Sequence, residues 1–328
     1  MFTVKNLVLT VLAAISLPLY FLLLLMFHQR RHHQPYCTPF FKICISLGVA
    51  DIMNLVSSYL FIKMPSRGWF PAGLILQIGS GWPNKLGYLS AFLFGNAQHI
   101  GGILLAYNRY TALSKPLEHV LVWSDKNTAR LIALQWTVAT LLVLPVSRQQ
   151  FHVLTNTTQN GVYIRPRDII TFQLFSLFTA ILFTLATVTV GALYCLLYWR
   201  VTREKAEAVV VVAQAPKGVI YRQKAAMKAD EKPQLGRSQI GTKQREQVEE
   251  QRKLQMQLAL MGTSIFVVML LFALFLWFFI IGTVMGVSLQ SFNFYTVISD
   301  VYCWINPWIV LCSSRIRSDF VKFMLCKN

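Results

Sequence analysis

Seven apolar segments, each long enough to cross a lipid bilayer, constrain this chain more than any other feature. A membrane-spanning helix needs about 20 predominantly apolar residues, and in hydrocarbon only a helix or a closed barrel pairs all of its own backbone polar groups. The segments cover residues 6–27, 40–62, 85–107, 129–146, 169–199, 254–282 and 292–312. They predict an all-α membrane protein, in which a bundle of seven transmembrane helices forms a single domain over residues 1–328.

Charged residues are few and lie mainly between the apolar segments. Asp, Glu, Lys and Arg make up 13% of the chain, whereas an ordinary soluble domain contains about 25%. The net charge of +18 would suggest a nucleic-acid partner if the protein were soluble. Because the basic residues flank apolar segments instead, we expect membrane lipid as a partner and no nucleic acid.

The distribution of Lys and Arg predicts an N-terminus outside the cell and a C-terminus inside it. In this orientation 24 of the 31 basic residues lie on the cytoplasmic side, as the positive-inside rule requires. Lys63, directly after the second segment, is assigned to the outer side. Asn156 belongs to the sequon Asn156-Thr157-Thr158, which falls in a predicted outer loop and makes this asparagine a candidate for glycosylation, although such sequons also occur by chance.

Two polar segments complete the predicted architecture. Residues 200–253 form a long basic cytoplasmic loop with thirteen basic and seven acidic residues. We expect the two flanking helices to extend into this loop, around a middle that proline and glycine interrupt. After the last span, residues 314–326 predict a short amphipathic helix with Ile316, Phe320 and Phe323 on one side.

Motifs for a metal site, a cofactor or catalysis are missing from the sequence. The six cysteines include no CxxC pair and no metal-ligand spacing, so we expect neither a structural zinc site nor a disulfide framework. A membrane hydrolase would need intramembrane His and Asp residues at ligand spacing, but His28, His32 and His33 lie in a polar loop. We therefore expect a protein that is not an enzyme and that uses no cofactor.

Three ionisable residues inside the apolar segments are candidates for function, because charge in a bilayer costs about 2.5 to 3.5 kcal/mol on insertion scales. Asp51 lies in the second segment, His99 in the third and Asp300 in the seventh. His99 is also consistent with a structural hydrogen-bonding group. Together the three allow an alternative function, an ion-coupled or proton-coupled transporter or channel, although the chain lacks the internal repeat of many transporters.

Arg109 closes the third apolar segment in the stretch NRYTALSKPL, residues 108–117. Leu105, Gly102 and Gln98 fall on the same helical face as Arg109, and small or amide side chains there suit packing against other helices. The pattern predicts that Arg109 points into the bundle. The alternative is an arginine that only anchors this end of the segment at the lipid headgroups.

The wider pattern resembles the rhodopsin-like G-protein-coupled receptors. NRYTALSKPL is similar to the motif that closes their third helix, with Arg109 followed by Tyr110 and, seven residues on, Pro116. LGVAD, ending at Asp51, resembles the second-helix signature, Trp136 with Pro145 the fourth helix, and Asn306-Pro307 the seventh. These four motifs occur in the correct order on the correct segments, and together they cover most of the chain.

At several positions the sequence departs from that pattern, and these positions exclude some classes of rhodopsin-like receptor. Asn108 replaces the usual acidic residue, so we expect a weaker restraint on Arg109 at rest. Phe279 replaces the proline of the sixth helix, and the outer disulfide cannot form because the third segment begins without cysteine. Ala91 stands where amine receptors carry aspartate, and Asp300 where opsins carry the retinal lysine. These two positions argue against an amine receptor and against an opsin.

The remaining features resemble the nematode serpentine chemoreceptors. They are the NRY triplet, PLEHVLVW after it, a very short N-terminal segment, Ser-Asp ahead of Asn-Pro, and the SSRIR tail. Within that group the chain is most similar to the Srv type of the Srg superfamily, and the neighbouring Srg, Sru, Srx and Srt types stay open. The resemblance implies a multi-pass receptor in the plasma membrane of a sensory neuron. Its partners would be an unknown small-molecule ligand and a heterotrimeric G protein.

The resemblance also implies roles for individual residues. The activation switch and G-protein contact would comprise Asn108, Arg109, Tyr110 and Pro116. A polar network in mid-bundle would link Asp51, Asn306 and Pro307. Candidates for the ligand pocket in the outer half are Ala91, Phe92, Gly95, Asn96, Trp277, Thr296 and Asp300.

Overall fold

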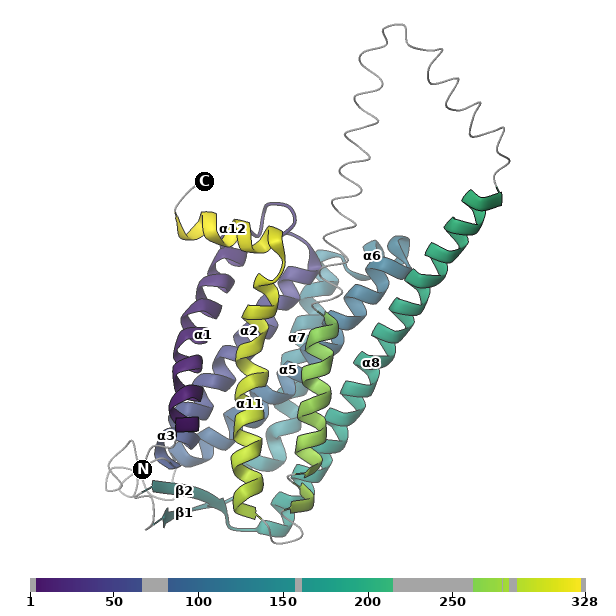
Figure 1. The fold of residues 1–328 in the computed structure, drawn as a ribbon. Helices are drawn as coiled ribbons and strands as arrows, with labels where there is room; N and C mark the ends of the chain where they lie inside the picture. The colour runs from purple at the N-terminus through teal and green to yellow at the C-terminus, as the bar shows by residue number, and fades with distance from the viewer. Residues whose placement is uncertain are drawn as a thin grey trace, which may run out of the picture.

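The computed structural model describes residues 4–66, 82–156, 161–214, 262–278, 280–282 and 288–325. Helices α6 (Pro116–Val122) and α12 (Ser314–Met324) lie at one end of a helical bundle, and strands β1 (Phe151–Asn156) and β2 (Gly161–Pro166) lie at the other (Figure 1). We call these the α12 end and the hairpin end. The charge distribution of the sequence predicts that the α12 end is cytoplasmic.

Long helices follow the predicted apolar segments. By length and composition, six helical stretches within the described residues are able to cross a membrane. Five of them belong to α1 (Val4–Gln29), α2 (Pro39–Ser58) with its continuation, α5 (Trp82–Ser114), α7 (Asp125–Ser147) and α8 (Ile169–Gln214), and the sixth is the helix Gly262–Gly282. A seventh helix of 24 residues, α11 (Ser288–Leu311), packs against α1 and α2 and completes the bundle.

The second span continues beyond its predicted end at residue 62, and this corrects the assignment of Lys63 to the outer loop. After α2 the chain makes a π-helical turn, η1 (Tyr59–Lys63), and then a short α3 (Met64–Ser66). A π-turn inserts one extra residue and so rotates every later side chain about the helix axis. Lys63 is consequently buried inside the bundle, with only 4% of its surface exposed.

Helix α8 is 46 residues long and extends well past residue 199, where the predicted span ends. The first part of the segment predicted as a cytoplasmic loop, up to Gln214, is therefore helical. The rest of that segment, residues 215–253, lies outside the described residues, as does the predicted start of the sixth span.

A β-hairpin that the sequence did not predict joins α7 to α8. Strands β1 and β2 pair antiparallel, with Phe151 opposite Pro166 and Asn156 opposite Gly161. The ring of Phe151 stacks on Tyr88 of α5 with centroids 4.8 Å apart, which fixes the hairpin to the bundle. Asn156 of the sequon is the last residue of β1, and its side chain lies outside the described set.

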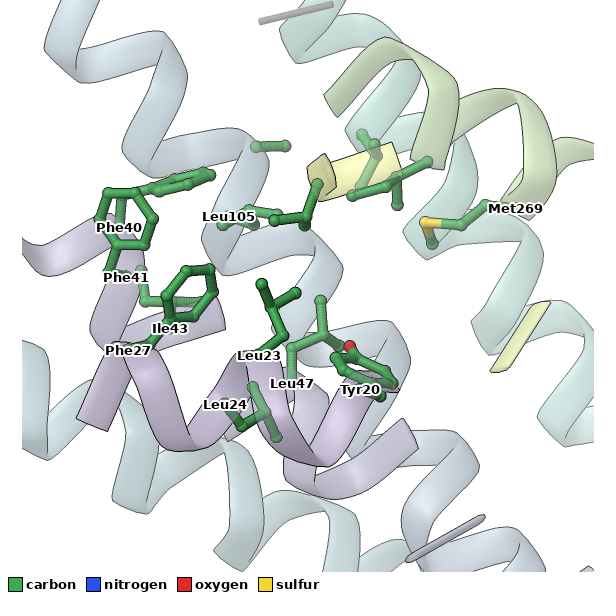
Figure 2. Close-up of a cluster of buried hydrophobic side chains, with 14 of the residues drawn as sticks. Tyr20, Leu23, Leu24, Phe27, Phe40, Phe41, Ile43, Leu47, Leu105 and Met269 are labelled. Atoms are coloured by element: carbon green, nitrogen blue, oxygen red, sulfur yellow. The ribbon is translucent and has the colours of Figure 1, made fainter. Parts of the chain in front are cut away.

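The main hydrophobic core lies where α1, α2 and α5 meet, towards the α12 end (Figure 2). Within it, Phe27 packs edge to face on Phe41 with ring centroids 5.1 Å apart. Leu105 of α5 and Met269 of the helix Gly262–Gly282 extend the cluster across the bundle.

Helix α12 packs its apolar face onto the bundle and is held by a polar contact. Ile316 is fully buried and Phe320 nearly so. Asp319 accepts a hydrogen bond from the hydroxyl of Tyr36 at 2.7 Å and pairs with Arg30 at 3.5 Å. Burial and the hydrogen bond to Asp319 raise the pKa of Tyr36, so this phenol stays protonated. The contact fastens α12 to the chain between α1 and α2.

Candidate functional site

Arg109 points into the bundle at the α12 end, as its helical face predicted. Only 2% of its surface is exposed, so this side chain is not an anchor at the lipid headgroups. The guanidinium carbon lies 3.4 Å from the centre of the Phe40 ring, at the start of α2. An aromatic face attracts a cation through its quadrupole, and the attraction is stronger where water is excluded. Phe40 is itself 3% exposed and backed by the main core.

Asn108, next to Arg109 in the chain, is buried, and its amide nitrogen Nδ2 has no hydrogen-bond partner among the described residues. The residue is 2% exposed. A buried polar group without a partner costs roughly 1 to 3 kcal/mol. Tyr110, the third residue of the motif, is partly buried against the main core.

Thr111 fastens α6 to the end of α5. Its hydroxyl oxygen accepts a hydrogen bond from the indole Nε1 of Trp123 at 2.8 Å and lies 3.0 Å from Nδ1 of His119. Burial and the positive charge of Arg109 lower the pKa of His119, which keeps its imidazole neutral at physiological pH. His119 and Trp123 of PLEHVLVW therefore have a structural role: they set the position of α6.

The opposite face of α6 is apolar and exposed. Pro116 begins the helix. One residue later Leu117 is 86% exposed, and Val120 and Leu121, which follow at helical spacing, are 71% and 75% exposed. Residues three and four apart share one face of a helix, so these three side chains form a single patch, the α6 patch. Figure 1 shows α6 at the α12 end of the bundle, and Arg109 lies in the last turns of α5, directly before α6.

In mid-bundle, Asp51 collects hydrogen bonds from three different helices. Its carboxylate accepts from the hydroxyl of Tyr20 at 2.5 Å, from the amide of Gln98 at 2.6 Å and from the amide of Asn306 at 2.7 Å. These donors belong to α1, α5 and α11, and Asp51 is 1% exposed. Pro307, next to Asn306 in α11, lacks a backbone donor and so loosens the helix there. Tyr20 and Gln98 are partners that the motifs did not identify.

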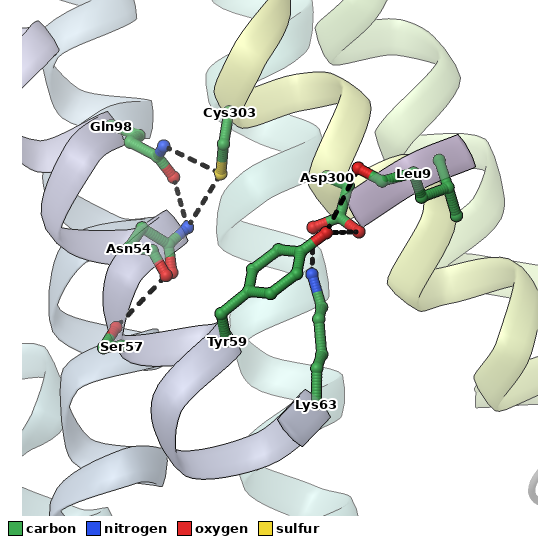
Figure 3. Close-up of polar contacts among 8 residues, drawn as sticks. All are labelled: Leu9, Asn54, Ser57, Tyr59, Lys63, Gln98, Asp300 and Cys303. Atoms are coloured by element: carbon green, nitrogen blue, oxygen red, sulfur yellow. Dashed lines mark hydrogen bonds and ion pairs between the residues drawn. The ribbon is translucent and has the colours of Figure 1, made fainter. Parts of the chain in front are cut away.

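The amides around Asp51 continue the network towards the hairpin end. Asn54, one turn further along α2, donates to the side-chain oxygen of Gln98 at 2.9 Å and to the sulfur of Cys303 at 3.4 Å (Figure 3). All three of these residues are buried. Because each member has its own partner, the network ties α2, α5 and α11 together at one level of the bundle.

Asp300 forms a buried ion pair with Lys63, which the sequence had placed outside the membrane. Figure 3 shows the ammonium of Lys63 directed at the Asp300 carboxylate, with the phenol of Tyr59 beside both. The Tyr59 hydroxyl lies 3.3 Å from Asp300 and 3.4 Å from the carbonyl oxygen of Leu9 in α1. Lys63 also lies over the Tyr59 ring, 4.7 Å from its centre. The π-turn thus joins α1, α2 and α11 near the hairpin end.

The other pocket candidates lie apart from this ion pair. Phe92 packs edge to face on Phe175 of α8, with centroids 4.9 Å apart. A Cβ placed on Gly95 would meet nothing within 4 Å among the described residues, so space remains beside it. Trp277 donates through Nε1 to the hydroxyl of Thr184 at 2.9 Å. Ala91 is half-buried and Asn96 buried on the same helix, whereas the side chain of Thr296 lies outside the described set.

His99 lies among aromatic rings, and its contacts are different from those of Asp51 and Asp300. Its ring centroid is 3.8 Å from that of Phe183, and its Nδ1 lies 3.4 Å from the hydroxyl of Tyr302. Asp51, His99 and Asp300 therefore each belong to a different set of contacts. This separation does not favour the alternative of one ion path running through all three residues.

The chain is similar to known proteins in sequence and in fold. Residues 9–326 match the family model described as "Serpentine type 7TM GPCR chemoreceptor Srv". Serpentine receptor class V-1 of Caenorhabditis elegans is 32% identical over 161 residues, which are 48% of this chain and 51% of that protein. The chain thus matches about half the length of this curated relative.

The fold of the chain is also similar to that of a solved structure. The crystal structure of squid rhodopsin has a TM-score of 0.64 to this chain at 14% sequence identity, covering 98% of this chain and 85% of that one. This likeness confirms the seven-helix bundle predicted from the apolar segments.

Proposed function

Because the chain belongs to the Srv family of serpentine seven-transmembrane chemoreceptors, we propose that it binds a small molecule and activates a heterotrimeric G protein. Family and fold make it a multi-pass membrane receptor of the G-protein-coupled type. The ligand, the G protein and a place in the plasma membrane of a sensory neuron belong to the proposal.

One observation carries this proposal: Arg109 and the α6 patch lie at the same end of the bundle, which is the predicted cytoplasmic end. A buried arginine on an aromatic ring can be released by a movement of helices, because the stacking contact depends on their spacing. The patch beside it is exposed although it consists of leucine and valine, and exposed apolar patches mark interaction sites. We assign the packing with Arg109 on Phe40 to the resting receptor.

The polar network around Asp51 supplies the link between the two ends. A ligand shifts the equilibrium between resting and active packings only by its differential affinity for them. Asp51 accepts hydrogen bonds from side chains of α1, α5 and α11. A shift of any one of these helices therefore changes the contacts of the others. Phe92, the space beside Gly95 and Trp277 supply a largely apolar lining towards the hairpin end, which suits a small molecule.

Leu117→Asp with Leu121→Asp tests the docking role of the α6 patch. We expect ligand-stimulated nucleotide exchange on a purified G protein to fall at least about tenfold, because two charges would face an apolar contact. Both side chains are largely exposed, so folding and surface delivery should be unchanged. The matched control is Val321→Asp, which changes a 49% exposed residue of α12 at the same end. Equal exchange in the α6 variant and the control would contradict the proposal.

Asn108→Asp tests the weak resting restraint expected from the sequence. The aspartate would place a carboxylate next to the Arg109 guanidinium, where the amide Nδ2 now lacks a partner within the described residues. We expect basal G-protein activation, measured at equal surface expression, to fall below that of the wild type. Asn127→Asp, at the same end of the bundle, provides the control. Unchanged basal activity in Asn108→Asp would show that the missing acid has no effect on the resting state.

A further inference from the structure

An apolar groove runs along the outside of the bundle between α1 and α2. It encloses a cavity of about 280 Å³, and seven of its eight lining residues are apolar. Those from α1 recur at helical spacing and so form one stripe, as do those from α2. The lining consists of Phe21, Leu24, Leu25 and His28 from α1, and of Ile45, Val49, Ile52 and Met53 from α2.

The groove faces the membrane. Phe21, Val49 and Met53 are 59%, 41% and 45% exposed, so no described part of the chain covers them. Both lining helices belong to candidate membrane spans. In a bilayer the surroundings of such a surface are acyl chains, which makes an acyl chain the chemically matched occupant of the apolar part.

Positive charge lies at the α12 end of the groove. His28 closes the lining there, and Nη1 of Arg31 lies 2.5 Å from its Nε2 atom. Nε of Arg31 donates to His32 at 3.1 Å. Both histidines and Arg31 are exposed, so a ligand in the headgroup region can reach them.

Arg31 has no acidic partner within the described residues, whereas Arg30 and Lys42 each have one. Arg30 pairs with Asp319, and Lys42 donates to Asp125 at 2.7 Å. The guanidinium of Arg31 contacts two imidazoles instead. Since arginine only donates, Nε2 of His32 must accept from it, and so must one of the two ring nitrogens of His28, which both lie within 3.2 Å of Nη1. Planar guanidinium groups bind phosphate with paired hydrogen bonds.

We propose that this groove is a binding site for an anionic glycerophospholipid. The phosphate and the acidic headgroup contact Arg31 and His28, and one acyl chain fills the groove between α1 and α2. The charge distribution of the sequence places this end in the cytoplasmic leaflet, where anionic lipids lie. The bound chain rests on Leu24, which packs against Gly48 of α2 one helical turn from the Tyr20–Asp51 hydrogen bond. The lipid therefore supports the spacing of the two helices that this bond joins.

Native mass spectrometry of the purified full chain tests this site with phosphatidylserine and phosphatidylcholine of identical acyl chains. We expect phosphatidylserine to bind about fivefold tighter, and Arg31→Gln to remove that preference, because one basic residue near the surface contributes about that factor. Val49→Trp, which fills the groove, should reduce the binding of both lipids. The controls are Arg130→Gln, an exposed arginine away from the groove, and Val188→Trp, a lipid-facing residue of α8.

Each result decides for or against the site. Loss of the preference in Arg31→Gln, together with loss of binding in Val49→Trp and normal behaviour of both controls, supports it. It is overturned if either variant matches its control, or if cholesterol displaces phosphatidylserine, which would make the groove a sterol site. Should Val49→Trp unfold, as judged by circular dichroism, Met53→Trp takes its place, because Met53 lies in the same wall of the groove.

Discussion

Replacement of Lys63 by methionine is expected to destabilise the purified receptor by about 3 to 5 kcal/mol. The substitution removes one partner of a buried ion pair. Among the described residues it leaves the carboxylate of Asp300, which is 1% exposed, with only the weak hydrogen bond from Tyr59. An uncompensated charge in a low-dielectric interior is costly because it loses its hydration. The measurement is the midpoint of thermal unfolding in detergent, followed by circular dichroism.

The double variant Lys63→Met with Asp300→Leu separates the cost of the unpaired charge from the value of the pair. Replacing both members of a buried ion pair by apolar residues is often neutral or stabilising. We therefore expect the double variant to unfold close to the wild-type temperature. Lys85→Met is the control, since it removes a partly exposed lysine at the start of α5. Equal destabilisation in the single and double variants would mean that the loss of stability does not come from an unpaired Asp300 carboxylate.

Lys63 also shows why part of the site could not be predicted from the sequence. Apolar length placed the end of the second span at residue 62, and in a regular α-helix a charged residue there belongs to the membrane surface. The π-turn at Tyr59–Lys63 changes the direction of every side chain after Tyr59, and no local signal in YLFIK marks it. The ion pair depends on this turn and on a tertiary contact with α11.

The Asp51 network was partly accessible from sequence. Asp51 and Asn306 stand out because polar groups in a membrane span need partners, and the structure joins them at 2.7 Å. Tyr20 carries no such signal, because tyrosine is common in apolar helices and its role depends on which way α1 faces. The β-hairpin was missed for a related reason. Its strands are six residues long, and the contacts that hold them to the bundle, such as the stacking of Phe151 on Tyr88, exist only in the folded chain.

Arg109→Ala should abolish G-protein activation while the receptor still reaches the cell surface. Arg109 is buried at the predicted cytoplasmic end. The substitution removes a buried charge and leaves no charged partner unpaired, so we expect the receptor to fold. The measurement is ligand-stimulated nucleotide exchange at matched surface expression. Arg130→Ala, which changes an exposed arginine at the same end, is the control. Unimpaired exchange in Arg109→Ala would end the assignment of this residue as the switch.

Phe40→Leu tests the same switch from the opposite side, because it keeps Arg109 and removes only the ring beneath it. A cation over an aromatic face contributes about 2 kcal/mol where water is excluded, which corresponds to a shift of about 30-fold in a two-state equilibrium. If Phe40 holds the resting packing, its loss raises basal nucleotide exchange without ligand, whereas Arg109→Ala lowers stimulated exchange. Phe183→Leu is the matched control, since its buried ring packs edge to face on Phe272, in the core and away from Phe40. Equal basal activity in both phenylalanine variants would assign the Arg109 contact to stability and not to switching.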